Sequence, residues 1–133
     1  MRYVTAEEVI RINATILGTQ PEVRDAGLLA SAAGRPAQVV FGEDAYPTLF
    51  DKVAALMESI CLNHCFIQGN KRTAVIAAIH MLNWNGWDLV AEQMDLVDVT
   101  LGVVDHRIDQ GKLADWISQH AVEPGLPDLG DVE

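Results

Sequence analysis

Apolar residues recur at intervals of three and four through most of the chain, which is the spacing of a helix face and not of a strand. The run "TAEEVIRINATILG" begins with Thr5 and Glu8 in capping-box relation and ends at Gly18. The next run, "RDAGLLASAAG", has Asp25 in an N-cap position and Gly34 where a C-terminal glycine is expected. The pattern therefore predicts two helices in the N-terminal part.

The helical period disappears between Arg35 and Pro47. This segment contains "QVVF", the only run in it that favours β-structure, bounded by Pro36 and Gly42. We expect a long loop with some strand character.

Four more helices are predicted after this loop. The third is "PTLFDKVAALMESICLN", and the fourth, "TAVIAAIHMLNWNG", is apolar almost all round, which is typical of a helix enclosed by others. The fifth carries one apolar stripe, made of Met94, Val97, Leu101, Val104 and Ile108. The sixth runs from Lys112 to about His120.

These elements predict an all-α fold of about six helices, with a helical domain at 1–122 and an acidic, Pro/Gly-rich tail at 123–133. A chain of 133 residues is long enough for one domain with its own core. The tail, "VEPGLPDLGDVE", has no apolar period, and we expect it to be mobile or loosely docked.

Charge and composition exclude several classes of function. The net charge of −10 has the wrong sign for holding a nucleic-acid backbone. No apolar run has the length of a membrane span, and "MRYVTAEEVI" lacks the apolar core of a signal peptide. Cys61 and Cys65 form no evident disulfide framework. We therefore expect a cytoplasmic protein with reduced thiols and no direct nucleic-acid or membrane partner.

The segment "HCFIQGNKR" carries the candidate chemistry. Lys71 and Arg72 stand where the fourth helix begins, although that end of a helix is already positive. Gly69 and Asn70 would offer unpaired backbone N–H groups to an anion, and the two cations could neutralise further phosphate oxygens. His64 is the side chain suited to proton transfer near neutral pH. Together they indicate transfer from a nucleotide to a hydroxyl.

Simpler roles remain open for the same residues. His64 could cap the third helix, and Asn70 could be an ordinary N-cap. The cations Lys71 and Arg72 could pair with acids elsewhere. Cys61, His64 and Cys65 also allow a zinc site, provided that a distant histidine supplies a fourth ligand.

The same nine residues resemble the signature of the Fic/Doc superfamily, His-x-Phe-x-(acid)-(Gly/Ala)-Asn-(Gly/Lys)-Arg. "RDAGLLASAAGRP", "YPTLFDKVAAL" and "NKRTAV" are also similar to stretches of Doc-type toxins, so the resemblance covers roughly residues 3 to 120. Lys71 stands where Fic AMP-transferases carry a second glycine, which looks like the Doc branch. The resemblance implies a compact helical bundle with its active-site loop between helices three and four.

The resemblance also implies an activity and partners. Doc-type toxins belong to type II toxin–antitoxin systems and use ATP and Mg²⁺ to phosphorylate a threonine of translation elongation factor Tu, which arrests translation. Their partner is a Phd-like antitoxin whose disordered C-terminal segment folds as a helix into a groove of the toxin. A flap, here Arg35 to Tyr46, holds the target segment in extended form.

Residue roles carry over by position. His64 would be the base that activates the target hydroxyl, and Phe66 would anchor the loop in the core. Gly69 and Asn70 would hold phosphate. Lys71 and Arg72 would clamp the nucleotide, with lysine at this position associated with presentation of the γ-phosphate.

One position departs from the signature. Gln68 stands where the family carries an acid that binds magnesium, and an amide oxygen lacks the charge of a carboxylate. Two alternatives follow. One is a weak or inactive member that acts by binding nucleotide or antitoxin. The other is an AMP-transferase of the Fic type, against which Lys71 argues.

Overall fold

The structure is a computed structural model in which residues 1–124 are described. The described part contains six α-helices: α1 (Ala6–Leu17), α2 (Ala26–Gly34), α3 (Leu49–Asn63), α4 (Asn70–Trp84), α5 (Gln93–Val104) and α6 (Gln110–His120). It also contains a 3₁₀ turn, η1 (Arg35–Ala37), and four two-residue strands: β1 (Val39–Val40), β2 (Glu43–Asp44), β3 (Asp88–Leu89) and β4 (Ala121–Val122). The predicted all-α fold of about six helices is confirmed.

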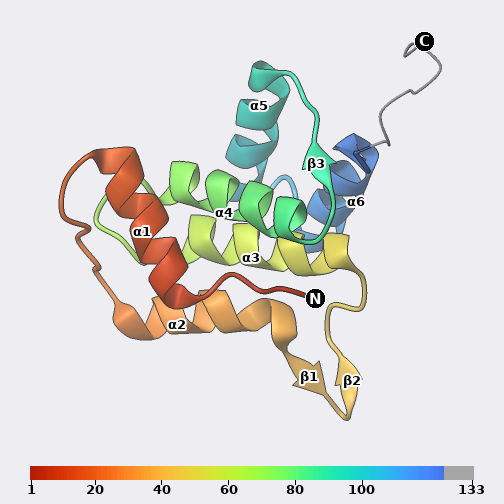
Figure 1. Ribbon diagram of the computed structural model, residues 1–133, viewed down its shortest axis with the longest axis horizontal. Helices are drawn as coiled ribbons and strands as arrows, with labels where there is room; N and C mark the ends of the chain where they lie inside the picture. The colour runs from red at the N-terminus through yellow and green to blue at the C-terminus, as the bar shows by residue number, and fades with distance from the viewer. Residues whose placement is uncertain (125–133) are drawn as a thin grey trace, which may run out of the picture.

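Helices α3 and α4 lie side by side in the centre of the molecule (Figure 1). α1 packs on α4, and α2 packs on α3. Helices α5 and α6 also pack on α3. Val53, Leu56 and Ile60 of α3 are completely buried, as is Met81 of α4. These two helices form the core, and the loop that joins them is thereby fixed at both of its ends.

The helix starts follow local side-chain chemistry. Thr5 and Glu8 form the predicted capping box of α1, and Gly18 ends that helix in the left-handed conformation with φ 69°. Asp25 accepts from the backbone N–H of Leu28 and so caps α2, as predicted. α2 ends at Gly34 without a left-handed turn, because Gly34 has φ −83° and the chain continues into η1.

The segment with strand character forms a small hairpin. β1 pairs with β2 in antiparallel fashion, with Val39 opposite Asp44 and Val40 opposite Glu43. The turn between them, Phe41–Gly42, has positive φ at both residues, 52° and 80°, as a tight hairpin turn requires. This hairpin lies within the predicted flap, Arg35 to Tyr46, and that segment is called the flap below.

The apolar stripe seen in the sequence of α5 faces mainly outward. Met94, Val97 and Leu101 are exposed, while α5 packs inward through the face that contains Val99 and Gly102. A Cβ at Gly102 would lie 2.5 Å from Cδ1 of Ile108, so the close approach of the following chain requires glycine. Because both faces of α5 carry apolar residues, periodicity alone does not determine which one is buried.

Two further predictions concern the C-terminal tail and the lack of a membrane span. Of the predicted tail, 123–133, all but the first two residues lie outside the described part, so its boundary stays a prediction. Across residues 1–124, none of the helices combines the length and the apolar character that crossing a membrane requires.

Candidate active site

His64 ends α3 and begins the loop to α4. It is exposed and takes the left-handed conformation, with φ 50° and ψ 51°. A residue other than glycine is uncommon there because its Cβ crowds the backbone. The alternative that His64 caps the third helix is therefore confirmed for its backbone position. The same residue is exposed, so its ring is accessible at the start of the loop that leads to α4.

The loop between the two helices, residues 64–69, is called the active-site loop below. Phe66 is buried in the core, as the family resemblance implies. The side chain of Asn70 closes a ring with it: Oδ1 accepts from Phe66 N at 3.0 Å, and Nδ2 donates to Phe66 O at 2.8 Å. Asn70 is thus the first residue of α4 and not its N-cap, which is Gly69. Its amide is occupied by the loop, which leaves its backbone N–H for an anion.

A second chain segment supports the loop from outside. Val23 forms an isolated antiparallel bridge with Phe66, and Ile67 N donates to Glu22 O at 3.0 Å. The backbone N–H groups of Arg24 and Asp25 donate to Cys65 O at 2.7 and 3.2 Å. The loop therefore has partners along its own backbone as well as at its ends.

The start of α4 has unpaired backbone N–H groups that could receive an anion. Gly69 has φ 81°, a conformation that favours glycine, and a Cβ there would lie 3.1 Å from Nδ2 of Asn13, which would have to move slightly. The first backbone hydrogen bond of the helix runs from Thr73 N to Gly69 O at 2.9 Å. The N–H groups of Asn70, Lys71 and Arg72 consequently have no partner within the helix. These groups and the helix dipole fit the phosphates of a nucleotide.

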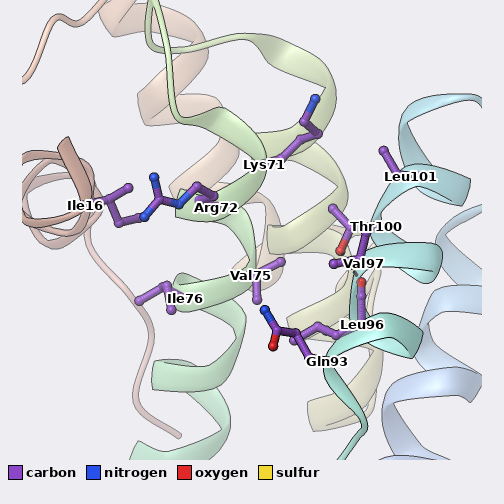
Figure 2. Close-up of a pocket in the computed structure, with 10 residues that line it drawn as sticks. All are labelled: Ile16, Lys71, Arg72, Val75, Ile76, Gln93, Leu96, Val97, Thr100 and Leu101. Carbon is purple, nitrogen blue, oxygen red and sulfur yellow. Dashed lines mark hydrogen bonds between the residues drawn. The ribbon is translucent and has the colours of Figure 1, made fainter.

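Lys71 and Arg72 are exposed, and neither forms an ion pair with an acid of residues 1–124. Pairing with acids elsewhere is thus not seen in the described part. Figure 2 shows that the two side chains diverge, with Arg72 directed towards Ile16 of α1 and Lys71 directed away from it. In this structure the two cations flank the helix start on different sides.

Gln68 is exposed, and its backbone oxygen accepts from Asn13 Nδ2 at 3.0 Å. Over residues 1–124, no three His, Cys, Asp or Glu side chains gather closely enough to hold a metal ion. The loop therefore fits the phosphates of a nucleotide but supplies no carboxylate for magnesium.

Cys61 and Cys65 are free, buried thiols. Burial raises the pKa of Cys61 to about 12, and burial also raises the pKa of Cys65. Within residues 1–124 they belong to no group of three His, Cys, Asp or Glu side chains close enough to hold a metal ion. The zinc interpretation is not supported for these residues.

Sequence reasoning missed Asn13. It is completely buried on the inner face of α1 and donates to Gln68 O and, at 3.2 Å, to Thr73 Oγ1. Its Oδ1 has no partner among the described residues. The available signal was a polar residue between Ile12 and Ile16 on a face that is otherwise apolar.

An apolar groove of about 380 Å³ begins beside the candidate site and runs between α1, α4 and α5 (Figure 2). It is lined by Ile16, Lys71, Arg72, Val75, Ile76, Gln93, Leu96, Val97, Thr100 and Leu101. A second depression shares Ile16 and Ile76 with it and continues between α1 and α4 to Arg11, His80 and Trp84. The exposed stripe of α5 forms one wall of the first groove. Together the two depressions are called the α1/α4/α5 groove below.

Comparison with known proteins places this arrangement in a family. The model of the Fic/DOC family matches residues 3–82. The chain is 46% identical over 90 residues to "Toxin Doc" of Mycolicibacterium smegmatis, covering 68% of this chain and 69% of that protein. It is 31% identical over 121 residues to "Protein kinase doc" of Escherichia phage P1, covering 88% and 94%. The chain belongs to the Fic/Doc family.

Proposed function

We propose that this protein is the toxin of a type II toxin–antitoxin system and an ATP-dependent phosphotransferase. Its acceptor is a threonine hydroxyl, on translation elongation factor Tu, and its effect is the arrest of translation. The observation that carries the proposal is an exposed histidine, His64, at the beginning of a short, well-anchored loop that ends in a helix start with unpaired backbone N–H groups. The name of one relative, "Toxin Doc", supports the toxin role, and the name of the other, "Protein kinase doc", supports phosphotransfer.

In phosphoryl transfer, the active-site loop and the start of α4 would have separate roles. ATP, when bound, supplies the γ-phosphoryl group. The N–H groups at the start of α4 bind and orient the phosphates, with Lys71 and Arg72 neutralising charge on their outer oxygens. His64 accepts the proton of the threonine hydroxyl as that oxygen bonds to the γ-phosphorus. The bond from this phosphorus to the β–γ bridging oxygen breaks, and ADP leaves.

Gln68 sets a limit on this chemistry. Magnesium at such sites is usually held by one or two carboxylates together with substrate phosphates, and the loop offers only an amide oxygen. The same feature motivates the second candidate, a family member that binds nucleotide or antitoxin with little or no transfer. AMP transfer is the third candidate, and Lys71 argues against it.

The test uses purified protein, elongation factor Tu, magnesium and ATP labelled at either the γ- or the α-phosphate. Transfer of the γ-label alone is expected, and it should fall to a small residual rate in His64→Ala while the thermal unfolding of that variant is unchanged. Transfer of the α-label would support the AMP-transferase instead. Absence of both labels, in wild type and in Gln68→Asp, would contradict the phosphotransferase. A gain in Gln68→Asp alone would show that residue 68 limits the reaction.

The flap is the proposed site for the target segment. Val39 and Val40 of β1 and Phe41 at the turn are all exposed, so the hairpin presents apolar side chains and a free strand edge. An extended peptide can add to such an edge through main-chain hydrogen bonds. This supports a target that is bound in extended form.

The α1/α4/α5 groove is the proposed site for the helix of a Phd-like antitoxin. Its floor is apolar, and three cations of a chain with net charge −10, Arg11, Lys71 and Arg72, lie along it, against one acid, Glu8, that is paired with Arg2. An amphipathic helix with acidic flanks would complement both features. Val97→Glu should abolish neutralisation and binding of the antitoxin encoded beside this chain, and Val90→Glu, exposed but outside the groove, should not. Equal binding by both variants would contradict this location.

A further inference from the structure

Arg24, which precedes α2, makes an unusual contact with the end of α3. Its side-chain Nε donates to His64 O at 2.6 Å, and one terminal nitrogen donates to Asn63 O at 3.0 Å. Its backbone N–H donates to Cys65 O at 2.7 Å. One residue thus binds three successive carbonyl groups around the candidate base, from a position 40 residues away.

The geometry suits an arginine in particular. The last carbonyl groups of a helix have no partner within it, and a cation there is favoured by the helix dipole. A guanidinium holds its donors in a rigid plane, so two neighbouring carbonyl groups are fixed together. Fixing the carbonyl of His64 fixes the peptide plane that follows it. Together with the left-handed φ of 50°, this sets the direction in which the imidazole leaves the backbone.

We infer that Arg24 is a positioning residue for His64, acting through the backbone carbonyl groups of residues 63–65 and not by touching either substrate. The inference rests on the proposed function, because it assigns His64 the role of the base. Misplacing a catalytic group by about 1 Å can cost about 100-fold in rate. Arg24 therefore contributes to the rate of transfer and leaves the binding of ATP and target unchanged.

Kinetics of Arg24→Met and Arg24→Lys test this role, with Arg107→Met as the matched control. Arg107 is an exposed arginine that pairs with Asp105, two residues before it, at the end of α5. In Arg24→Met, kcat should fall about 10- to 100-fold with both KM values unchanged. Arg24→Lys, which keeps the charge but loses the planar fork, should lie between. An unchanged kcat, or a higher KM for ATP with kcat kept, would overturn the inference.

A double-mutant cycle with His64→Ala separates positioning from a direct role. If Arg24 acts through His64, Arg24→Met should cost nothing further in residual transfer once His64 is alanine. The same loss in both backgrounds would mean that Arg24 acts on the reaction by itself. That result would overturn the assignment as well.

A measurement without substrate distinguishes this inference from the proposed function. The chain has four histidines, so the imidazole signals of histidine-labelled protein can be assigned with His64→Ala. Arg24→Met should shift or broaden the His64 signals and leave those of His106 unchanged, in a protein that still unfolds in one cooperative transition, at a lower temperature because two hydrogen bonds to carbonyl groups are lost. Unaltered His64 signals would overturn the inference. If they change and wild type transfers no phosphate, the proposed function fails while Arg24 still orders His64.

Discussion

Helix α3 carries a loop at each of its ends, and the two loops are held in opposite ways. The flap, before its N-terminus, is fixed by side chains at its base and leaves its tip free. The active-site loop, after its C-terminus, is bound along its backbone by Asn13, Asn70 and the segment 22–25. The difference matches the work proposed for each: a reacting group needs fixed geometry, whereas a surface that receives a peptide needs accessible edges.

Two cations hold the base of the flap. Lys52 of α3 is only 3% exposed, and its Nζ donates to Pro36 O at 3.2 Å and to Asp44 Oδ2 at 3.4 Å. Arg35 donates to the hydroxyl of Tyr46 at 2.7 Å and to Glu58 at 2.8 Å. Entry and exit of the hairpin are therefore tied to α3. Nothing comparable ties its turn within the described residues.

The largest effect is expected when the active-site loop loses its internal clamp. Asn70→Ala leaves the N–H and carbonyl of Phe66 without partners in a half-buried setting, which should cost about 2–3 kcal/mol in the free energy of unfolding. Phosphotransfer should fall below detection because the start of α4 loses its geometry. Chemical unfolding and the γ-label assay measure the two effects.

The matched control lies at the other end of the same helix. Asn85, just after α4, also binds backbone groups through its amide, accepting from Arg2 N and donating to Arg2 O and Met81 O, each at 2.8 Å. Asn85→Ala should destabilise the protein by a similar amount and keep the transfer rate of the folded enzyme. Equal loss of activity in both variants would mean that stability, and not loop geometry, limits the reaction.

A smaller effect is expected at the base of the flap. Lys52→Met keeps the apolar stem and removes the charge that binds Asp44 and Pro36, so the hairpin loses one of its two attachments. The KM for the target protein should rise about tenfold, equivalent to about 1.4 kcal/mol, with the KM for ATP unchanged. Lys112→Met, at an exposed lysine of α6, is the control. A rise in both KM values would show that the flap is not separate from the nucleotide site.

The sequence predicted local features well and long-range ones poorly. The capping residues Thr5 and Asp25 act on neighbours three positions away, so short motifs revealed them. The outward face of α5 depends on which neighbours the helix meets, and its composition was apolar on both sides. In the site, the nine-residue motif located the histidine and the helix start, whereas Asn13 and Arg24 act over 55 and 40 residues. Only tertiary structure brings such pairs together.

A third and smaller effect is expected in the pH dependence of the free energy of unfolding. It arises from Cys61, near the end of α3 that leads into the active-site loop. The pKa of Cys61 is raised by burial to about 12 from 9.0, so above pH 9 the unfolded chain releases a proton that the folded chain retains. Stability is therefore fully present below pH 9 and falls as the pH rises from there towards 12. The loss attributable to Cys61 should be on the order of 1 kcal/mol at pH 9.5. Cys65, whose pKa is also raised, adds in the same direction.

Urea unfolding of wild type and Cys61→Ala at pH 8 and pH 9.5 measures this loss. The variant has a lower free energy of unfolding at both pH values because a buried side chain is shortened. Between pH 8 and pH 9.5, however, its free energy of unfolding should fall by less than that of wild type, and the difference should equal the loss attributed to Cys61. Parallel decreases in the two proteins would contradict the assignment to Cys61. No cysteine lies in the flap, so variants of the flap should leave this pH dependence as it is.

The smallest effect is expected at the tip of the flap. Phe41 is fully exposed and has φ 52°, a conformation that asparagine tolerates better than an aromatic residue. Phe41→Asn forms an Asn-Gly turn and should leave the free energy of unfolding unchanged or raise it by a few tenths of a kcal/mol. The KM for the target protein should nevertheless rise about threefold, because an apolar contact is lost. Phe41→Tyr, which keeps the ring, should match wild type. Improved stability without a change in KM would show that the target does not touch the turn, and would restrict its contact to the free edge of β1.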